Sequence, residues 1–473
     1  MVQVISVFLL YPLFILLPYW AHAQDGHYWT QNFGTKSMLL GNSVVGGVED
    51  LGLVYYNPAR LAVIKKPAFL MSADVYEWNS FKFKDVLGDS KNLSSTNFRG
   101  LPNFVAGAFK LKGLKKHRFA YAFLVRQRFD VDVTFSEEVD NSQNEQVDNL
   151  FFNSTIGIKQ RINEEWTSLT WSYLIKDNLS FGLMAGISTI NQQKSNSIGV
   201  NALADSSNVT AYLFDRSYGF ERDGFILKAG LSYQLKQVLL GFTLLTPRMN
   251  FSGSGGSYTY REQLSGSSGE DFFTSSVQKN LKAAYKSPWA VAVGASFPVK
   301  FGKLHFSSEW YSGVPAYMIF EAEDHQSQSN GSVKEFRLVD DLRSVLNVGF
   351  GVEILLSENW SAYGSFSTDF SAAPNEFITV TEIRSIANNT ALRANYFHTA
   401  GGVVAVLKQV SVTLGASYTS GSERVPRLVD FPEEGNDNHL DRANASKLVW
   451  NRLRLVVSLS VPFIRELEKR ILD

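Results

Sequence analysis

Residues 453–463 read LRLVVSLSVPF, and almost every second side chain in this stretch is large and apolar. Successive side chains of an extended strand point to opposite faces. One face therefore carries Leu453, Leu455, Val457, Leu459, Val461 and Phe463, and the other carries Arg454, Val456, Ser458, Ser460 and Pro462. Residues 360–370 (WSAYGSFSTDF) and 410–418 (VSVTLGASY) alternate in the same way, with small or polar residues on one face. This alternation is typical of a β-barrel whose outer face meets lipid.

The same alternation recurs along most of the chain, and the connections between the alternating segments are short and long in turn. A soluble sandwich would also alternate along each strand, but it has no reason to make every second connection long. We therefore predict an all-β fold, a single transmembrane antiparallel β-barrel of about 14 strands over residues 67–463. The expected strands are 67–78, 103–111, 118–135, 166–174, 180–192, 208–235, 238–252, 289–297, 303–312, 345–355, 360–370, 398–407, 410–418 and 447–463. The expected long loops are 79–102, 136–165, 193–207, 253–288, 313–344, 371–397 and 419–446.

The segment 208–235 is the weakest part of this assignment. It could be one long strand, or a hairpin that turns near Arg222-Asp223-Gly224. A hairpin would give an odd number of strands and would break the alternation of short and long connections. We therefore predict one strand here.

Composition excludes several kinds of protein. The formal net charge is zero, with 45 basic and 45 acidic residues, so nothing indicates nucleic-acid binding. Cysteine is absent, which excludes disulfides and thiolate metal sites. We expect no cofactor and no metal. The acidic group Glu433, Glu434, Asp437 and Asp441 could bind calcium, but a solvated loop is the simpler interpretation.

Motifs of enzymes are also missing. The seven histidines show no H-E-x-x-H spacing, and the chain has no G-x-S-x-G elbow. Outer-membrane phospholipases place Ser and His on barrel strands, an arrangement that spacing alone does not reveal. We predict a protein that is not an enzyme.

The two ends of the chain differ from the barrel segment. An apolar run from Val4 to Leu17 precedes Ala21-His22-Ala23, which predicts a signal peptide over residues 1–23. Pro12 and Pro18 argue against the alternative of a membrane anchor. Residues 464–473 place apolar side chains at helical spacing, which predicts a short periplasmic amphipathic tail.

Between the signal peptide and the first strand, residues 24–66 are rich in glycine and small residues. A segment of this size could hardly fold alone. A barrel of about 14 strands leaves an interior that its own side chains cannot fill. We therefore expect residues 24–66 to pack inside the barrel.

The stretch Gly41–Leu61 resembles the N-terminal hatch of the FadL/TodX outer-membrane transporters, which carry long-chain fatty acids and aromatic hydrocarbons. The resemblance rests on a glycine-rich turn, an acidic pair and an Asn-Pro-Ala step. It implies a barrel in the outer membrane of a Gram-negative bacterium, plugged by the hatch, with a hydrophobic ligand site in the lumen. The residues that it marks as hatch residues are Gly46, Gly47, Asp50, Asn57, Pro58 and Ala59.

The family also implies sideways exit of the ligand through a gap made by a kinked third strand. The third strand here, Phe119–Phe135, contains no Gly or Pro, so the usual means of bending a strand is missing. We therefore expect a third strand without a kink and an exit route that differs from the family's.

Charged side chains along two strands are candidates for the lumen. Large apolar residues occupy one face of the third strand, and we place Arg126, Arg128, Asp130 and Asp132 together on the other face. An Arg facing the lipid midplane costs about 2 to 4 kcal/mol, so these residues should avoid lipid. His305 and Glu309 are assigned inward on the same grounds. The arginines could receive a carboxylate head group, although a structural ladder that holds the hatch is the preferred interpretation.

Two functions of different class fit these features. The first is passive uptake of a hydrophobic small molecule, a fatty acid or aromatic hydrocarbon, by a monomer that sits in outer-membrane lipid. The second is a barrel that serves as a scaffold or adaptor for an envelope secretion or assembly machinery. A hydrophobic ligand site between hatch and wall would favour transport, and a lumen filled by polar side chains would favour the scaffold.

Overall fold

In a computed structural model, residues 26–47, 49–64, 68–85, 92–140, 151–203, 209–266, 271–373, 393–407, 410–425 and 446–462 are described. The predicted signal peptide, the acidic group at 433–441 and the predicted tail lie outside these residues. The helices are α1 (Lys36–Leu39), α2 (Leu53–Tyr56) and the 3₁₀ helix η1 (Pro58–Val63). No helix in the described part of the chain has the length and apolarity that crossing a membrane requires.

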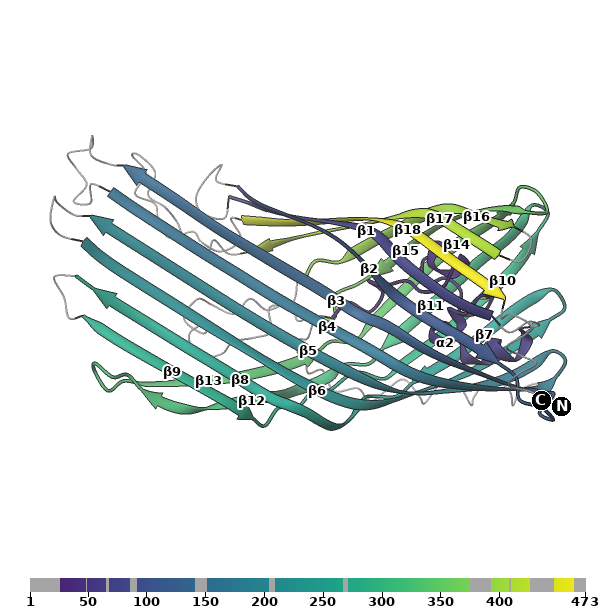
Figure 1. Ribbon diagram of the computed structural model, residues 1–473, viewed down its shortest axis with the longest axis horizontal. Helices are drawn as coiled ribbons and strands as arrows, with labels where there is room; N and C mark the ends of the chain where they lie inside the picture. Colours follow the sequence, from purple (N-terminus) through teal and green to yellow (C-terminus); the bar gives the residue numbers. More distant parts are fainter. Residues whose placement is uncertain are drawn as a thin grey trace, which may run out of the picture.

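Strands make up nearly all of the remaining structure (Figure 1). They are β1 (Ala68–Lys84), β2 (Leu93–Phe109), β3 (His117–Asp140), β4 (Phe151–Lys176), β5 (Leu179–Leu203), β6 (Val209–Leu235), β7 (Val238–Leu245), β8 (Met249–Ser265), β9 (Phe272–Leu281), β10 (Ala290–Val299), β11 (Gly302–Tyr311), β12 (Val314–Gln326), β13 (Val333–Leu342), β14 (Val345–Leu355), β15 (Trp360–Asp369), β16 (Tyr396–Leu407), β17 (Val410–Val425) and β18 (Ser446–Pro462).

The sheet closes on itself as an antiparallel barrel. Its order runs β5-β4-β3-β2-β1-β18-β17-β16-β15-β14-β11-β10-β7-β6, and pairing of β5 with β6 completes the ring. Strand β6 pairs with β7 through residues 228–235 and with β8 through residues 211–225, so β7 and β8 form one interrupted wall strand. The consecutive strands β9 and β10, β11 and β12, and β13 and β14 are likewise each counted as one interrupted strand.

With these four pairs each counted once, the described wall has fourteen strands, as the sequence predicts. Each expected segment overlaps one of these strands. The segment 208–235 is a single strand, β6, so the hairpin alternative at Arg222-Asp223-Gly224 is excluded. Pro247 interrupts the strand between β7 and β8, because proline has no N–H to donate to a ladder.

The prediction of long loops is wrong over much of their length. Strand β4 has 26 residues and β5 has 25, so most of 136–165 and 193–207 is regular strand. A strand that crosses a membrane needs only about 9–11 residues. Strands β3 to β6 therefore continue well past the length that a bilayer requires, and Figure 1 shows them reaching further from the helices than β1, β2, β17 and β18 do.

The polarity of the two faces reverses along these long strands. In the first part of β5, Leu183 and Ile187 are exposed on the outer face while Ser188 is fully buried inside. Further along, Ile190 is buried inside and Gln193 is exposed outside. We call the end of the barrel that holds the helices (right in Figure 1) the lower part and the far end of β3 to β6 (left) the upper part, or extension. The lower part of the wall presents apolar side chains outward, and the upper part presents polar ones. This reversal marks where the lipid-facing band ends.

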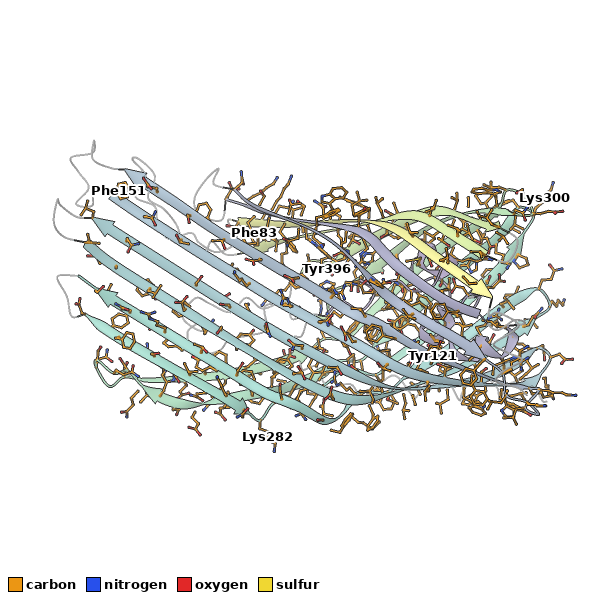
Figure 2. All side chains as sticks on the ribbon, in the orientation of Figure 1. Phe83, Tyr121, Phe151, Lys282, Lys300 and Tyr396 are labelled. Carbon is orange, nitrogen blue, oxygen red and sulfur yellow. The ribbon has the colours of Figure 1, made fainter. Side chains whose placement is uncertain are left out.

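Strand β3 achieves the same reversal with a β-bulge. Its pairing with β4 shifts register between Val125 and Gln127, so Arg126 is an extra residue on β3. Before the bulge, Tyr121 and Phe123 are exposed on the outer face. After it, apolar residues at the same odd-numbered spacing, such as Val131, are buried inside. Figure 2 labels Tyr121 near the helices and Phe151 of β4 at the far end of the extension.

Two expectations about the third strand are therefore corrected. The strand does bend, by a bulge that uses neither Gly nor Pro. Arg128, Asp130 and Asp132 face outward rather than inward, where Asp130 pairs with Arg161 at 3.1 Å and Asp132 with Lys159 at 3.4 Å. Only Arg126, the bulge residue, is buried inside.

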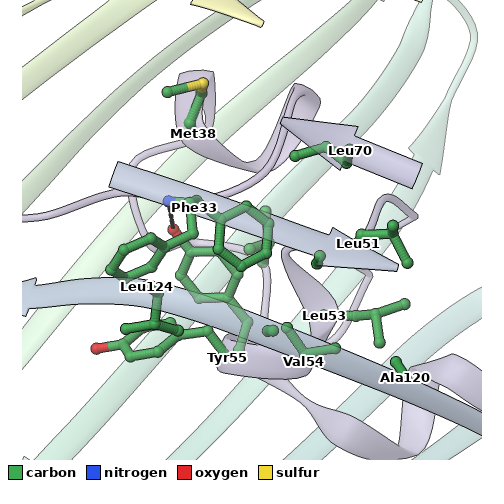
Figure 3. Packing of buried hydrophobic residues seen from close by; sticks show 14 of the residues in the cluster. Phe33, Met38, Leu51, Leu53, Val54, Tyr55, Leu70, Ala120 and Leu124 are labelled. Atoms are coloured by element: carbon green, nitrogen blue, oxygen red, sulfur yellow. Dashed lines mark hydrogen bonds between the residues drawn. The ribbon is translucent and has the colours of Figure 1, made fainter. Parts of the chain in front are cut away.

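The N-terminal segment, residues 26–47 and 49–64, lies inside the lower half of the barrel, which is the right half in Figure 1. Phe33, Leu39 and Leu53 are completely buried and join a core with wall residues such as Phe104 and Ala120 (Figure 3). Helices of four residues could not persist alone. Packing against the wall, rather than helix propensity, therefore holds this segment.

Candidate functional site

Asp50 organises the N-terminal segment through its carboxylate. Its Oδ2 accepts hydrogen bonds from the backbone N–H groups of Thr35, at 2.8 Å, and Ser37, at 2.9 Å. Its Oδ1 accepts from the Ser37 hydroxyl at 2.7 Å and from the Gly52 N–H at 2.9 Å. Thr35 and Ser37 flank the start of α1, where N–H groups have no partner within the helix. The carboxylate supplies those partners and joins the two halves of the segment.

Gly46 and Gly47 let the segment touch the wall backbone to backbone. A Cβ on Gly46 would lie 2.7 Å from the carbonyl oxygen of Gly294 in β10. A Cβ on Gly47 would lie 2.4 Å from the Cβ of Ser296. Real Cβ atoms do not approach so closely, so only glycine fits at either position.

The Asn57-Pro58-Ala59 step ties the segment to the nearby wall strands β6 and β5. Asn57 is fully buried, and its amide nitrogen donates to the carbonyl oxygens of Val45 at 2.9 Å and of Leu231 in β6 at 3.1 Å. Its Oδ1 accepts from the Ala59 N–H at 3.1 Å, which caps η1. The Ser180 hydroxyl of β5 donates to the Ala59 carbonyl at 2.9 Å.

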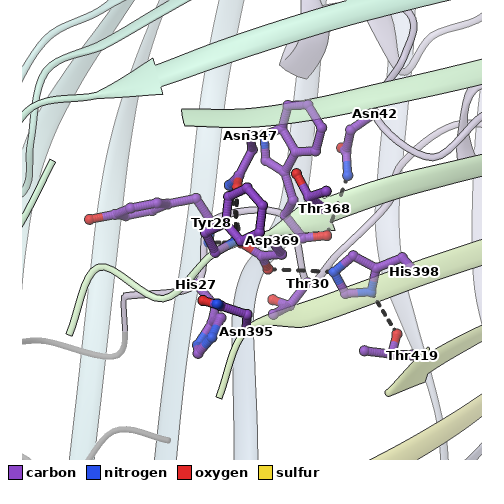
Figure 4. Close-up of polar contacts among 12 residues, drawn as sticks. His27, Tyr28, Thr30, Asn42, Asn347, Thr368, Asp369, Asn395, His398 and Thr419 are labelled. Atoms are coloured by element: carbon purple, nitrogen blue, oxygen red, sulfur yellow. Dashed lines mark hydrogen bonds and ion pairs between the residues drawn. The ribbon is translucent and has the colours of Figure 1, made fainter. Parts of the chain in front are cut away.

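Residues 26–30 are held by side chains from several strands (Figure 4). The Trp29 indole donates to Glu309 at 2.7 Å, and Arg452 donates to the Thr30 carbonyl at 2.6 Å. Glu309 and His305, the two inward candidates on β11, are both buried. Glu309 thus binds the N-terminal segment. The Nε2 of His305 lies 3.8 Å from a carboxylate oxygen of Glu353 on the neighbouring strand.

Sequence reasoning missed a buried row formed by Asp369, His398 and Thr419 (Figure 4). The His398 Nε2 lies 3.5 Å from the Asp369 Oδ2, and its Nδ1 lies 2.7 Å from the Thr419 hydroxyl. This arrangement of a carboxylate, an imidazole and a hydroxyl resembles the catalytic triad of a serine hydrolase. However, all three side chains are buried, and Asp369 also accepts the Tyr28 N–H at 2.9 Å. The row anchors the N-terminal segment, and no spacing signal could reveal it because its members come from three strands.

A cavity of about 40 Å³ lies where the N-terminal segment, β3 and the interrupted β7/β8 strand meet. Its lining is mainly aromatic and apolar, with a few polar groups. The lining residues are His27, Tyr28, Arg126, Gln127, Glu164, Trp166, Ile226, Leu245, Thr246, Tyr285, Ser287, Pro288 and Tyr311.

Arg126 is the cation of this cavity. Its guanidinium carbon lies 5.9 Å from the ring centres of Tyr28 and Tyr55 and 5.8 Å from that of Trp166. Burial raises the pKa of Tyr55 well above its ordinary value, so its phenol stays neutral beside the charge. Cation–π contact with two rings of the N-terminal segment and one of the wall makes Arg126 part of the attachment between them.

The wall opens beside this cavity. Strands β2 and β3 pair only from Phe109–Phe119 to Phe104–Leu124. Past Leu124, in the described part of the chain, β2 pairs only with β1 and β3 only with β4. The Ser95 hydroxyl donates to the Asp132 carbonyl at 2.9 Å further along. The unpaired stretch between these two contacts, which we call the β2–β3 window, begins next to Arg126.

A second, larger hollow of about 670 Å³ lies along β3 to β6 and β8. Its lining includes exposed side chains on the outer face of the extension, such as Asp132, Lys159 and Gln193. Because this surface is polar and open, it does not suit a hydrophobic ligand. The interior cavity at Arg126 is the better candidate site.

Comparisons with known proteins support the fold. A Pseudomonas aeruginosa FadL homologue aligns at 12% identity with a TM-score of 0.54, covering 92% of this chain and 100% of that chain. The P. putida toluene transporter TodX aligns at 11% identity with a TM-score of 0.55, covering 91% and 99%. A deltaS2S3 mutant of TodX, described as a monoaromatic hydrocarbon channel, aligns at 13% identity with a TM-score of 0.55, covering 92% and 100%.

No family model and no curated protein sequence matches the chain. The structural likeness nevertheless extends over more than nine-tenths of the chain and over essentially all of each aligned structure. The chain therefore has the β-barrel fold of FadL and TodX.

Proposed function

We propose that this protein is a channel in the outer membrane of a Gram-negative bacterium and that it takes up hydrophobic small molecules passively. The structures that share its fold are described as a FadL homologue and as a toluene transporter. The apolar outer face of the lower wall suits a lipid environment, and the polar outer face of the extension suits water. We expect a monomer, with a fatty acid or an aromatic hydrocarbon as ligand.

One observation carries this proposal. The cavity at Arg126 and Gln127 adjoins the β2–β3 window, so an apolar binding space inside the barrel lies next to a break in its wall. A ligand in that space could leave sideways at the bulge, where the lipid-facing band ends, without crossing the polar interior. Burying an apolar body supplies about 0.8 kcal/mol per methylene, which is enough for binding without an energy source.

The upper interior supports the same route. A buried cluster there combines tyrosine, phenylalanine and aliphatic side chains from β4, β5, β6, β8, the β12–β13 hairpin and β14. Such a surface attracts apolar molecules and leads from the open end toward the cavity. A scaffold has no need of an aromatic interior, so the alternative role in a secretion or assembly machinery is less well supported.

The test of the window is a reversible cross-link. The Ser95 hydroxyl reaches the Asp132 backbone carbonyl at 2.9 Å, and the next residue, Val133, faces the interior as Ser95 does, which makes S95C/V133C a suitable pair in a chain without cysteine. With the window tied at both ends, uptake of a labelled alkylbenzene into cells should fall on oxidation and recover with reductant. The matched control is T399C/Y418C, which joins two residues already paired in the ladder of β16 and β17. Uptake that is unchanged by the S95C/V133C cross-link would remove the window from the route.

The test of the cavity is to fill it. Ile226 is buried and lines the cavity, so I226W should occupy the space and lower uptake, while I226V should preserve it. Correct folding of both variants would be checked by heat-dependent gel mobility. Uptake by folded I226W at the wild-type rate would exclude this cavity as the binding site.

A further inference from the structure

A turn at the lower end of the barrel carries a concentration of positive charge. Residues 110–118, which connect β2 to β3 and begin β3, read KLKGLKKHR and hold five lysine and arginine side chains and no acid. The other short turns that the structure describes at this end, residues 177–178, 236–237, 300–301 and 356–359, hold at most one lysine or arginine each. The β2–β3 turn, as we call residues 110–118, is therefore a basic patch at the end of the barrel that holds the helices (right in Figure 1).

Two leucines are exposed between these cations. Residues 111–116 are all exposed, with Leu111 at 44% and Leu114 at 39%. The Leu114 N–H donates to the Leu111 carbonyl at 3.2 Å, and the His117 N–H donates to the Leu114 carbonyl at 3.0 Å. Gly113 has a φ of +87°, and no described atom lies within 4 Å of the position that a Cβ would take there. Hydrogen bonds thus hold the loop in two tight turns that keep both leucines out of the barrel core.

Aromatic side chains lie directly above the turn on the outer face of the wall. The rings of Phe109 on β2 and Phe119 on β3 stack with centres 5.7 Å apart, and the Trp171 indole of β4 donates to the Nδ1 of His117 at 2.9 Å. Aromatic residues gather where the lipid of a membrane meets water, and the short turns of an outer-membrane barrel face the periplasm. The β2–β3 turn follows these rings within a few residues. It therefore lies at the level of the lipid headgroups on the periplasmic side.

Charge and apolar surface at this level fit one kind of partner. An anionic phospholipid offers a phosphate to the lysines and an acyl boundary to the leucines. Lysine can lay its apolar stem along that boundary while its ammonium group stays in the headgroup layer. A soluble acidic protein would match the charge, but it would leave Leu111 and Leu114 without a role.

We propose that the β2–β3 turn binds anionic phospholipids in the periplasmic leaflet of the outer membrane. Lys112, Lys115 and Lys116 contact the phosphate groups, and Leu111 and Leu114 enter the acyl boundary. Each lysine near an anionic surface raises lipid affinity about fivefold. Strands β2 and β3 also bound the β2–β3 window, so the bound lipid fixes the depth of that window in the membrane. The inference goes beyond the proposed uptake, because it names a lipid partner and requires no transported ligand.

The test compares an anionic lipid with a zwitterionic one. Binding of dioleoyl phosphatidylglycerol and of dioleoyl phosphatidylcholine to the purified protein in a non-ionic detergent would be measured by native mass spectrometry. The wild type should prefer phosphatidylglycerol, and K112Q/K115Q/K116Q should weaken that binding about hundredfold, the combined effect of three lysines. Binding of phosphatidylcholine should change little. The matched control K176Q/K236Q/K300Q removes three exposed lysines at the same end of the barrel and should leave the preference intact.

A second measurement reports where the turn lies. A solvatochromic fluorophore attached at L114C, in a chain without other cysteines, should show blue-shifted emission in vesicles that contain the two lipids in equal amounts. At N178C, on another exposed short turn, the same fluorophore should report water. Equal affinity of the wild type for the two lipids, an equal loss in the two triple variants, or water-like emission at L114C would overturn the proposal. Tight binding of soluble polyaspartate with no preference between the lipids would assign the turn to an acidic protein instead, and would overturn it too.

Discussion

At the scale of single residues, the N-terminal segment depends on a few side chains that satisfy many backbone groups at once. Asp50 accepts from the backbone of Thr35, Ser37 and Gly52, and Asn57 bonds to three separate segments. Asn57 is fully buried and Asp50 is half-buried, so water replaces a lost partner only poorly. Each lost bond therefore carries a desolvation cost of about 1 to 3 kcal/mol. The segment should be sensitive to changes that hardly alter shape.

We expect D50N to loosen the N-terminal segment without unfolding the barrel. The amide keeps the size of the carboxylate but replaces an acceptor with a donor, which would face the N–H groups that now donate to it. Single-channel recording in planar bilayers should show transient openings that the wild type lacks. D132N, which removes an outward carboxylate paired only with Lys159, is the matched control and should remain closed. A silent D50N channel would contradict the anchoring role of Asp50.

At the scale of elements, the long strands combine a lipid-facing part and a water-facing part in one continuous ladder. The outer face of β5 changes from Leu183 and Ile187 to Gln193 without any break in its pairing with β4 and β6. Strand β3 makes the same change by inserting Arg126 as a bulge. Because of the bulge, the apolar side chains of β3 lie on the outer face before Arg126 and on the inner face after it, although they still recur at every second residue.

A pair of substitutions on one face of β5 tests where lipid ends. L183R should destabilise the barrel by about 2 to 4 kcal/mol, because an arginine within the lipid-facing band loses its hydration. Q193R, at an exposed position on the same face above the band, should be close to neutral. Urea unfolding in lipid vesicles would measure both. Similar losses in the two variants would show that lipid covers the extension as well.

At the scale of the whole molecule, the barrel and the segment inside it share one core. Leu39, Leu53 and Phe33 of the segment pack against wall residues from β1 to β6 and from β15 to β18. Outside the β2–β3 window the wall satisfies its own backbone hydrogen bonds, whereas the segment cannot fold without the wall. We propose that residues 26–64 act as a hatch that closes the lumen.

Removal of residues 26–64 should leave a barrel that still inserts, since the ladder around the ring is complete without them. Its lumen should fill with water, because fourteen strands enclose more space than their side chains occupy. Planar-bilayer recordings should then show a steady open conductance, with intact protein as the reference. If the truncated barrel conducts no ions, another part of the chain closes the pore and the hatch role is lost.

The sequence by itself determined the number of strands and their faces, because a period of two residues is a local property that the lipid-facing band imposes directly. It placed β6 as one strand and identified Leu453 to Leu459 as an outward row, and both are confirmed. The sequence did not reveal the extensions of β3 to β6. There the outer face is polar, so the strands lack the outward apolar face by which the others were recognised.

Only the tertiary structure decided which distant residues meet. The bulge at Arg126 is invisible in the sequence, since the apolar spacing continues through it, and it turns Arg128, Asp130 and Asp132 outward. The row of Asp369, His398 and Thr419 draws on three strands. Their contacts depend on strand register, which is fixed by pairing between segments far apart in the chain and not by any local pattern.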